Sequence, residues 1–116
     1  MWMRHALLLG LCVAPLGYAN DFPTRARVEY VLSCMVESKR PQQEAMYKCS
    51  CAIDAIADKV TYRAWVDLST VANGITIAGE RGGVIRDLKG GRKLVASYRE
   101  LQDAAKKACF LGNDSR

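Results

Sequence analysis

The sequence predicts an all-α protein, a compact bundle-like domain of four helices that carries two disulfide bonds and follows a cleaved signal peptide. Three observations support this prediction. Apolar residues recur at helical spacing in four segments, only one short segment is rich in β-prone residues, and an even number of cysteines remains after processing. Removing the first 19 of the 116 residues leaves 97, which is the size of a single domain (20–116).

The first nineteen residues have the three parts of an export signal. Arg4 and His5 form a basic start, residues 6–14 form an apolar run, and Gly17 and Ala19 supply the small residues that signal peptidase requires. The run is too short to cross a bilayer, which takes about 20 residues as a helix. We therefore predict cleavage after Ala19, a periplasmic or secreted location, and no membrane span in the processed chain.

Processing changes the chemistry that is available to the chain. It removes Cys12 and His5, so four cysteines and no histidine remain. Without imidazole, Ser-His-Asp and Cys-His catalysis and histidine-ligated zinc or haem are excluded, and we predict a protein that is not an enzyme and has no cofactor. Loss of Arg4 lowers the net charge from +5 to +4, which together with the absence of a long basic run argues against nucleic-acid binding.

The helices are expected at residues 25–39, 41–60, 62–72 and 93–111. Thr24 should cap the first helix, and its inward face should hold four apolar residues, namely Val28, Val31, Leu32 and Met35. After Val60 the apolar pattern slips by two residues, about 200° around a helix. This slip predicts a break at residues 60–61 with Thr61 as the cap of the third helix. Residues 20–23 are expected to be a flexible leader.

A glycine-rich stretch precedes the last helix. Residues 79–91 contain five glycines, which predicts a loop, and Val84, Ile85 and Leu88 should fold this loop back onto the domain. Five basic residues lie in it or directly after it: Arg81, Arg86, Lys89, Arg92 and Lys93. Together with the free N–H groups at the start of the last helix, they favour contact with an acidic protein or a small anion. The alternative is a mobile polar connector.

The cysteines are the most informative residues. Cys49 and Cys51 point about 200° apart on a helix, so they cannot readily bond each other. A hairpin of the first two helices places residue 34 opposite residue 48, which favours Cys34–Cys49 and leaves Cys51–Cys109. A shift of one turn would instead select Cys34–Cys51 with Cys49–Cys109, so the sequence leaves both pairings open.

The cysteines and the carboxylates of the second helix suggest two further uses. The Cys-Ser-Cys motif could serve as a redox dithiol, but that use requires a lowered thiol pKa, and Lys48 is the only adjacent cation. Asp54 and Asp58 stand four residues apart on one helix and could hold a metal ion through carboxylate oxygens. The alternative for this pair is a solvated helix face with basic residues nearby.

Four segments carry a resemblance to a known group: 30–35, 47–57, 79–83 and the pair Arg86-Asp87. They resemble small four-cysteine periplasmic proteins that accompany quinoprotein (PQQ) alcohol dehydrogenases in methylotroph-type bacteria. The resemblance implies an accessory role, either docking to a dehydrogenase or its electron acceptor, or handling a metal. We therefore expect a non-catalytic periplasmic accessory protein that acts by protein–protein contact. The alternatives are a metal-binding or metal-delivery protein and a thiol–disulfide redox protein.

Mass spectrometry of the processed protein without reductant tests the disulfide prediction. We expect the mass of residues 20–116 less four hydrogens, because each bridge removes two. Unpaired thiols that are readily alkylated in the purified protein would contradict it.

Overall fold

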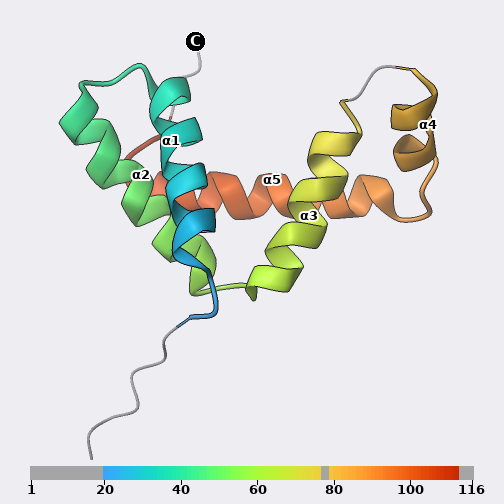
Figure 1. Cartoon of the computed structure of the whole chain (residues 1–116), viewed down its shortest axis with the longest axis horizontal. Coiled ribbons are helices and arrows are strands. Elements are labelled where there is room, and N and C mark those ends of the chain that lie inside the picture. Colours follow the sequence, from blue (N-terminus) through green and yellow to red (C-terminus); the bar gives the residue numbers. More distant parts are fainter. Residues whose placement is uncertain (1–19, 77–78, 113–116) are drawn as a thin grey trace, which may run out of the picture.

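The computed structural model describes residues 20–76 and 79–112, apart from the side chains of Glu80 and Arg81. The predicted signal peptide, 1–19, lies outside the described residues. Within the described part, the chain forms five helices and no strand (Figure 1): α1 (Thr24–Ser38), α2 (Gln42–Ala57), α3 (Tyr62–Gly74), α4 (Glu80–Arg86) and α5 (Gly91–Ala108). This confirms the all-α class and adds one helix, α4, to the four that the sequence predicted.

Helices α1 and α2 form an antiparallel hairpin that turns at residues 39–41. Lys39 ends α1 in the left-handed conformation (φ 52°), and Pro41 precedes α2, where its missing N–H leaves no helical hydrogen bond unmade. Across the hairpin, Cys34 is bonded to Cys49 with their Cα atoms 5.8 Å apart. The pairing that the hairpin register favoured is therefore confirmed.

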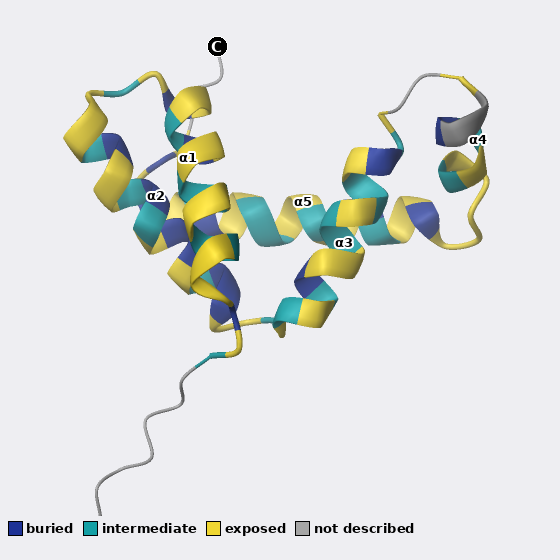
Figure 2. Cartoon of the chain, in the orientation of Figure 1, coloured by how far each residue is buried: buried dark blue, intermediate teal, exposed yellow. Residues whose placement is uncertain are grey.

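Helix α5 packs against both α2 and α3 and joins the two sides of the molecule (Figure 1). Cys109, at its C-terminal end, is bonded to Cys51 of α2, 58 residues earlier in the chain. This second bridge rules out the alternative pairing. The core lies along the inner faces of α2, α3 and α5, where Figure 2 shows the buried residues. Its largest fully buried side chains are Ile53, Ile56 and Cys49, all on α2.

The predicted break between the second and third helices is confirmed. Helix α2 ends at Ala57, and the side-chain oxygen of Thr61 accepts a hydrogen bond from the Ala64 backbone N–H at 3.2 Å. The predicted cap of α1 is wrong. Thr24 is the first residue of the helix, Pro23 occupies the capping position, and no side chain caps this end. Proline suits this position because its φ is already close to the value required.

Residues 20–23 are not the flexible leader that the sequence suggested. Phe22 is 6% exposed and belongs to the core cluster, with its ring centroid 5.4 Å from that of Tyr62. The carboxylate of Asp21 accepts a hydrogen bond from the backbone N–H of Tyr62 at 2.9 Å. The segment thus satisfies a free donor at the start of α3 and fills space beneath it.

The predicted inward face of α1 is only partly right. Val31 and Met35 pack against the core, but Val28 and Leu32 are exposed. The buried residues of α1 are instead Cys34 and Ser38. The bridge to Cys49 fixes this rotation, since it draws the face that carries Cys34 towards α2 and turns the opposite side to solvent.

Removing the Thr61 cap should destabilise the fold. We expect Thr61→Ala to lower the free energy of unfolding by about 1 kcal/mol, because the N–H of Ala64 loses its acceptor. Thr24→Ala is the matched control and should change stability by no more than about 0.5 kcal/mol. Denaturant titration of both variants checks this prediction, and an equal loss in the two variants would contradict it.

Candidate functional site

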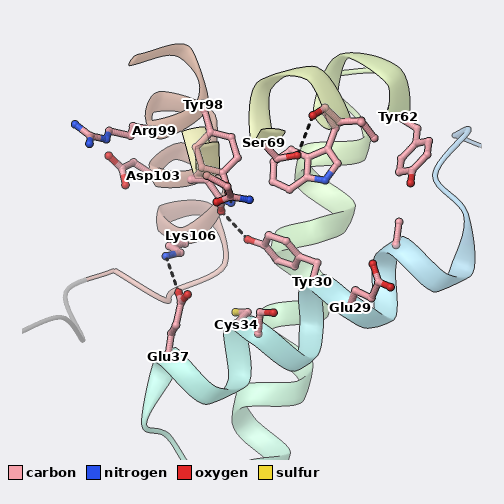
Figure 3. A pocket seen from close by; sticks show the side chains of 16 residues that line it. Glu29, Tyr30, Cys34, Glu37, Tyr62, Ser69, Tyr98, Arg99, Asp103 and Lys106 are labelled. Atoms are coloured by element: carbon pink, nitrogen blue, oxygen red, sulfur yellow. Dashed lines mark hydrogen bonds and ion pairs between the residues drawn. The ribbon is translucent and has the colours of Figure 1, made fainter. Parts of the chain in front are cut away.

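A groove of about 660 Å³ lies between α1 and α3, with α5 across its base and along one side (Figure 3). It exists because α1 packs chiefly on α2 while α3 packs chiefly on α5, so the two walls stand apart. The volume falls within the range of ligand sites in proteins, roughly 300–1,000 Å³. The described structure therefore offers a concave surface that is built from three separate helices.

Trp65 of α3 holds the base of the groove together. Its ring centroid lies 5.3 Å from that of Tyr98 on α5 and 5.9 Å from that of Tyr30 on α1. Phe22 approaches the same indole, with centroids 6.4 Å apart. Such pairs contribute about 0.5–1.5 kcal/mol each beyond the area that they bury. Trp65 thus links the N-terminal segment and three helices at one point.

A short chain of hydrogen bonds crosses the groove floor. The Tyr30 hydroxyl donates to Oε1 of Gln102 at 2.8 Å, and Nε2 of Gln102 donates to the Tyr98 hydroxyl at 3.0 Å. Burial raises the pKa of Tyr30 well above its ordinary value, and the nearby Tyr98 and Glu37 act in the same direction. Tyr30 therefore remains a neutral hydrogen-bond donor, while the Tyr98 hydroxyl acts as the acceptor at the other end of this chain of hydrogen bonds.

Charged side chains of both signs line the rim (Figure 3). The α1 wall carries Glu29 and Glu37, and the α5 side carries Arg99, Asp103 and Lys106. Lys106 and Glu37 form an ion pair across the groove at 3.8 Å. The rim can therefore meet a ligand that bears charges of either sign over an aromatic base.

The four predicted cysteines do not form one site. Cys49 and Cys51 belong to separate bridges, so the Cys-Ser-Cys motif holds two different neighbours and does not form a vicinal dithiol. Cys34 lines the groove wall, where its sulfur is bonded to Cys49. The two bridges are compatible with an extracellular or periplasmic protein, where disulfides persist.

The predicted carboxylate pair gives the metal hypothesis no support. Asp54 forms an ion pair with Arg27 of α1, and Asp58 caps the C-terminal end of α2. Across residues 20–76 and 79–112, no three histidine, cysteine or acidic side chains gather closely enough to hold a metal ion.

The glycine-rich stretch is not the loop that the sequence predicted, since most of it forms α4. Ile85 is seated between two buried glycines. A Cβ on Gly74 would lie 2.2 Å from Cδ1 of Ile85, and a Cβ on Gly91 would lie 3.3 Å from the Ile85 carbonyl oxygen. Here the glycines permit close packing of α4 on α3 and α5. Glycine content alone cannot distinguish this use from a flexible loop.

The basic residues of this region are only partly available to a partner. Arg86 donates a hydrogen bond to the Gly79 carbonyl at 3.2 Å, which ties the end of α4 to its start. Lys89, Arg92 and Lys93 are exposed, and the side chain of Arg81 lies outside the described residues. Of the three apolar residues expected to fold inward, only Ile85 packs, while Val84 and Leu88 are exposed.

Sequence reasoning missed the groove entirely. Helical periodicity gives no sign of a gap between helices, because the gap depends on which helices pair in space. One signal was present, because Tyr30, Trp65 and Tyr98 are large aromatic residues with polar atoms. Such residues are enriched where a protein surface binds a partner.

Comparison of the chain with protein-family models, with curated proteins and with solved structures gives no match. In the described residues, no helix is both long enough and apolar enough to span a bilayer.

Tyr30→Phe tests the hydrogen-bond chain across the groove. At neutral pH we expect a loss of about 1 kcal/mol in the free energy of unfolding, because Gln102 loses its donor. The folded pKa of Tyr30 lies above its unfolded value of about 10, so the wild type should lose stability as the pH rises above that value.

The variant lacks this titrating group and should therefore show a shallower alkaline decline in urea midpoints. Tyr47→Phe, at an exposed position on α2, is the control and should keep the wild-type decline. Parallel alkaline profiles for wild type and Tyr30→Phe would contradict the assignment.

Gly74→Val tests whether α4 requires the close contact between Ile85 and Gly74. Its added side chain would overlap Ile85, so we expect a loss of about 1–3 kcal/mol and faster amide hydrogen exchange in residues 80–86. Gly112→Val is the control, because a Cβ there meets nothing within 4 Å. Unchanged exchange in α4 of the Gly74 variant would show that the close packing is not required.

Proposed function

We propose that this chain is an exported, non-catalytic accessory protein that binds a segment of a partner protein in the groove between α1 and α3. The single observation that carries the proposal is the groove itself, about 660 Å³ in volume and based on Tyr30, Trp65 and Tyr98. Tyrosine, tryptophan and arginine dominate the binding energy of protein interfaces. This groove has the first two at its base and Arg99 at its rim.

The shape of the groove favours a helical segment as the ligand. Three helices line it, so a partner helix could lie in the space that separates α1 from α3, crossing α5 as those two helices do (Figure 1). Its apolar face would meet the aromatic base, and its flanks would meet the charges on the two rims. This arrangement would complete the bundle with a helix from another protein.

The chemistry of the lining supports binding over catalysis. The groove presents tyrosine and serine hydroxyls, two amides, carboxylates and two cations, and its cysteine is bonded to Cys49. A nucleophile paired with a base is the usual sign of covalent catalysis, and no histidine lines this groove to serve as such a base. Fixed hydrogen bonds such as Tyr30 to Gln102 suit a preorganised binding surface.

The resemblance drawn from the sequence supplies the first partner to test, a quinoprotein alcohol dehydrogenase from the same organism. A photoreactive phenylalanine analogue is placed at Ser69, which lines the groove, or at Thr70, the next residue of α3, which is exposed outside it. A third variant carries the analogue at Lys93, in the basic region. Each variant is irradiated with the purified dehydrogenase, and the crosslinked peptides are identified by mass spectrometry.

Crosslinking from Ser69 and not from Thr70 is expected, with the captured peptide lying in one helix of the dehydrogenase. Crosslinking from Lys93 alone would move the contact to the basic region and overturn the groove as the docking site. Failure of all three positions would exclude this dehydrogenase as the partner.

A further inference from the structure

The positive charge of the processed chain is concentrated at one end of the molecule. Residues 80–93 contain five basic and two acidic residues, a net charge of +3, whereas the whole of residues 20–116 has 16 basic and 12 acidic residues, a net charge of +4. Figure 1 shows that this stretch, α4 and the start of α5, forms the end of the molecule away from the α1–α2 hairpin. We call residues 80–93 the basic tip.

Apolar side chains are exposed at the same tip. Val84 is 71% exposed and Leu88 is 48% exposed, and they stand four residues apart. Ile85 packs against Gly74 and Gly91, and the neighbouring Val84 of α4 faces solvent. These two aliphatic side chains lie on the same short segment as the tip's cations, so the tip presents apolar and basic groups together.

Three cations at the tip are directed to solvent. Lys89, Arg92 and Lys93 are exposed, and within the described part of the chain none of them forms an ion pair. Asp87 is the one acidic residue whose side chain is described there, and it is exposed as well. The tip therefore offers positive charge that the chain itself does not neutralise.

We propose that the basic tip attaches the protein to the surface of an anionic lipid bilayer. Val84 and Leu88 would enter the boundary between headgroups and acyl chains, and Lys89, Arg92 and Lys93 would lie among the lipid phosphates. A bilayer is favoured over an acidic protein because a seven-residue helix and its flanks are small beside the roughly 800 Å² per partner of a stable protein interface. A lipid surface can be bound without a complementary shape on the protein.

This attachment does not depend on the groove or on its ligand. Helix α5 runs from the tip to the Cys51–Cys109 bridge over 18 residues, about 27 Å at 1.5 Å per residue. A molecule held by its tip would therefore keep the hairpin of α1 and α2 away from the lipid. With few charges and two aliphatic side chains, the binding is reversible and weakens as salt is added.

Cosedimentation with vesicles tests the proposal. The protein used begins at Asn20 and contains every described element, because the apolar run of the leader would itself bind lipid. Vesicles of phosphatidylcholine alone are compared with vesicles containing equal parts of phosphatidylcholine and phosphatidylglycerol. We expect binding to the anionic vesicles only, with release at high salt.

Two variants assign the contact. Lys89→Gln/Arg92→Gln/Lys93→Gln should weaken binding about 100-fold, since each cation near an anionic surface contributes several-fold. Val84→Ser/Leu88→Ser keeps the charge and should weaken binding about tenfold. The matched control, Lys59→Gln/Arg63→Gln/Lys107→Gln, removes the same charge from exposed positions outside the tip and should retain most of the binding.

Circular dichroism establishes that each variant is folded before binding is compared. Equal losses in the two charge triples would show that net charge alone drives adsorption, and this would overturn the proposal. Absence of binding to anionic vesicles would also overturn it and would leave an acidic protein as the remaining partner for these cations. Neither result would bear on crosslinking at Ser69, so the two proposals fail independently.

Discussion

Two cysteines separated by one residue leave α2 in nearly opposite directions, and the rest of the fold follows from that geometry. Cys49 bonds α1 on one side, and Cys51 bonds the end of α5 on the other. In the chain-entropy model, loops of 15 and 58 residues correspond to about 3 and 4 kcal/mol of stabilisation. Helix α2 is consequently the most deeply buried element, and α1 is covalently held against it.

The groove is a consequence of this tethering. Because α1 is held to α2 and α3 packs on α5, the two helices stay apart except at the base, where the rings of Tyr30 and Trp65 meet. Trp65 fills that base, and the Tyr30–Gln102–Tyr98 hydrogen bonds fix its floor. The same few residues thus stabilise the domain and shape its concave surface, so any ligand would meet side chains that are already ordered.

The parts of the structure that could be predicted from the sequence rest on local geometry. Helical periodicity located four helices and the break at Thr61, and the angle between positions 49 and 51 excluded a bond between them. The predictions that were wrong concern features that depend on how the helices pack against one another. Val28 and Leu32 are apolar and stand at helical spacing, which predicts an inward position. They are exposed because the disulfide at Cys34 fixes the rotation of α1. The glycines around Ile85 look like a loop but serve close packing, and the groove depends on which helices remain apart.

The docking of residues 20–22 has a practical consequence for how this protein is handled. Phe22 and Asp21 lie directly beneath α3, next to the aromatic base of the groove, so whatever is fused ahead of Asn20 leaves the domain close to that opening. Affinity tags or fluorophores attached there would crowd the concave face and could pull Phe22 from its place. Attachment at the opposite terminus, after Gly112, keeps labels clear of these residues.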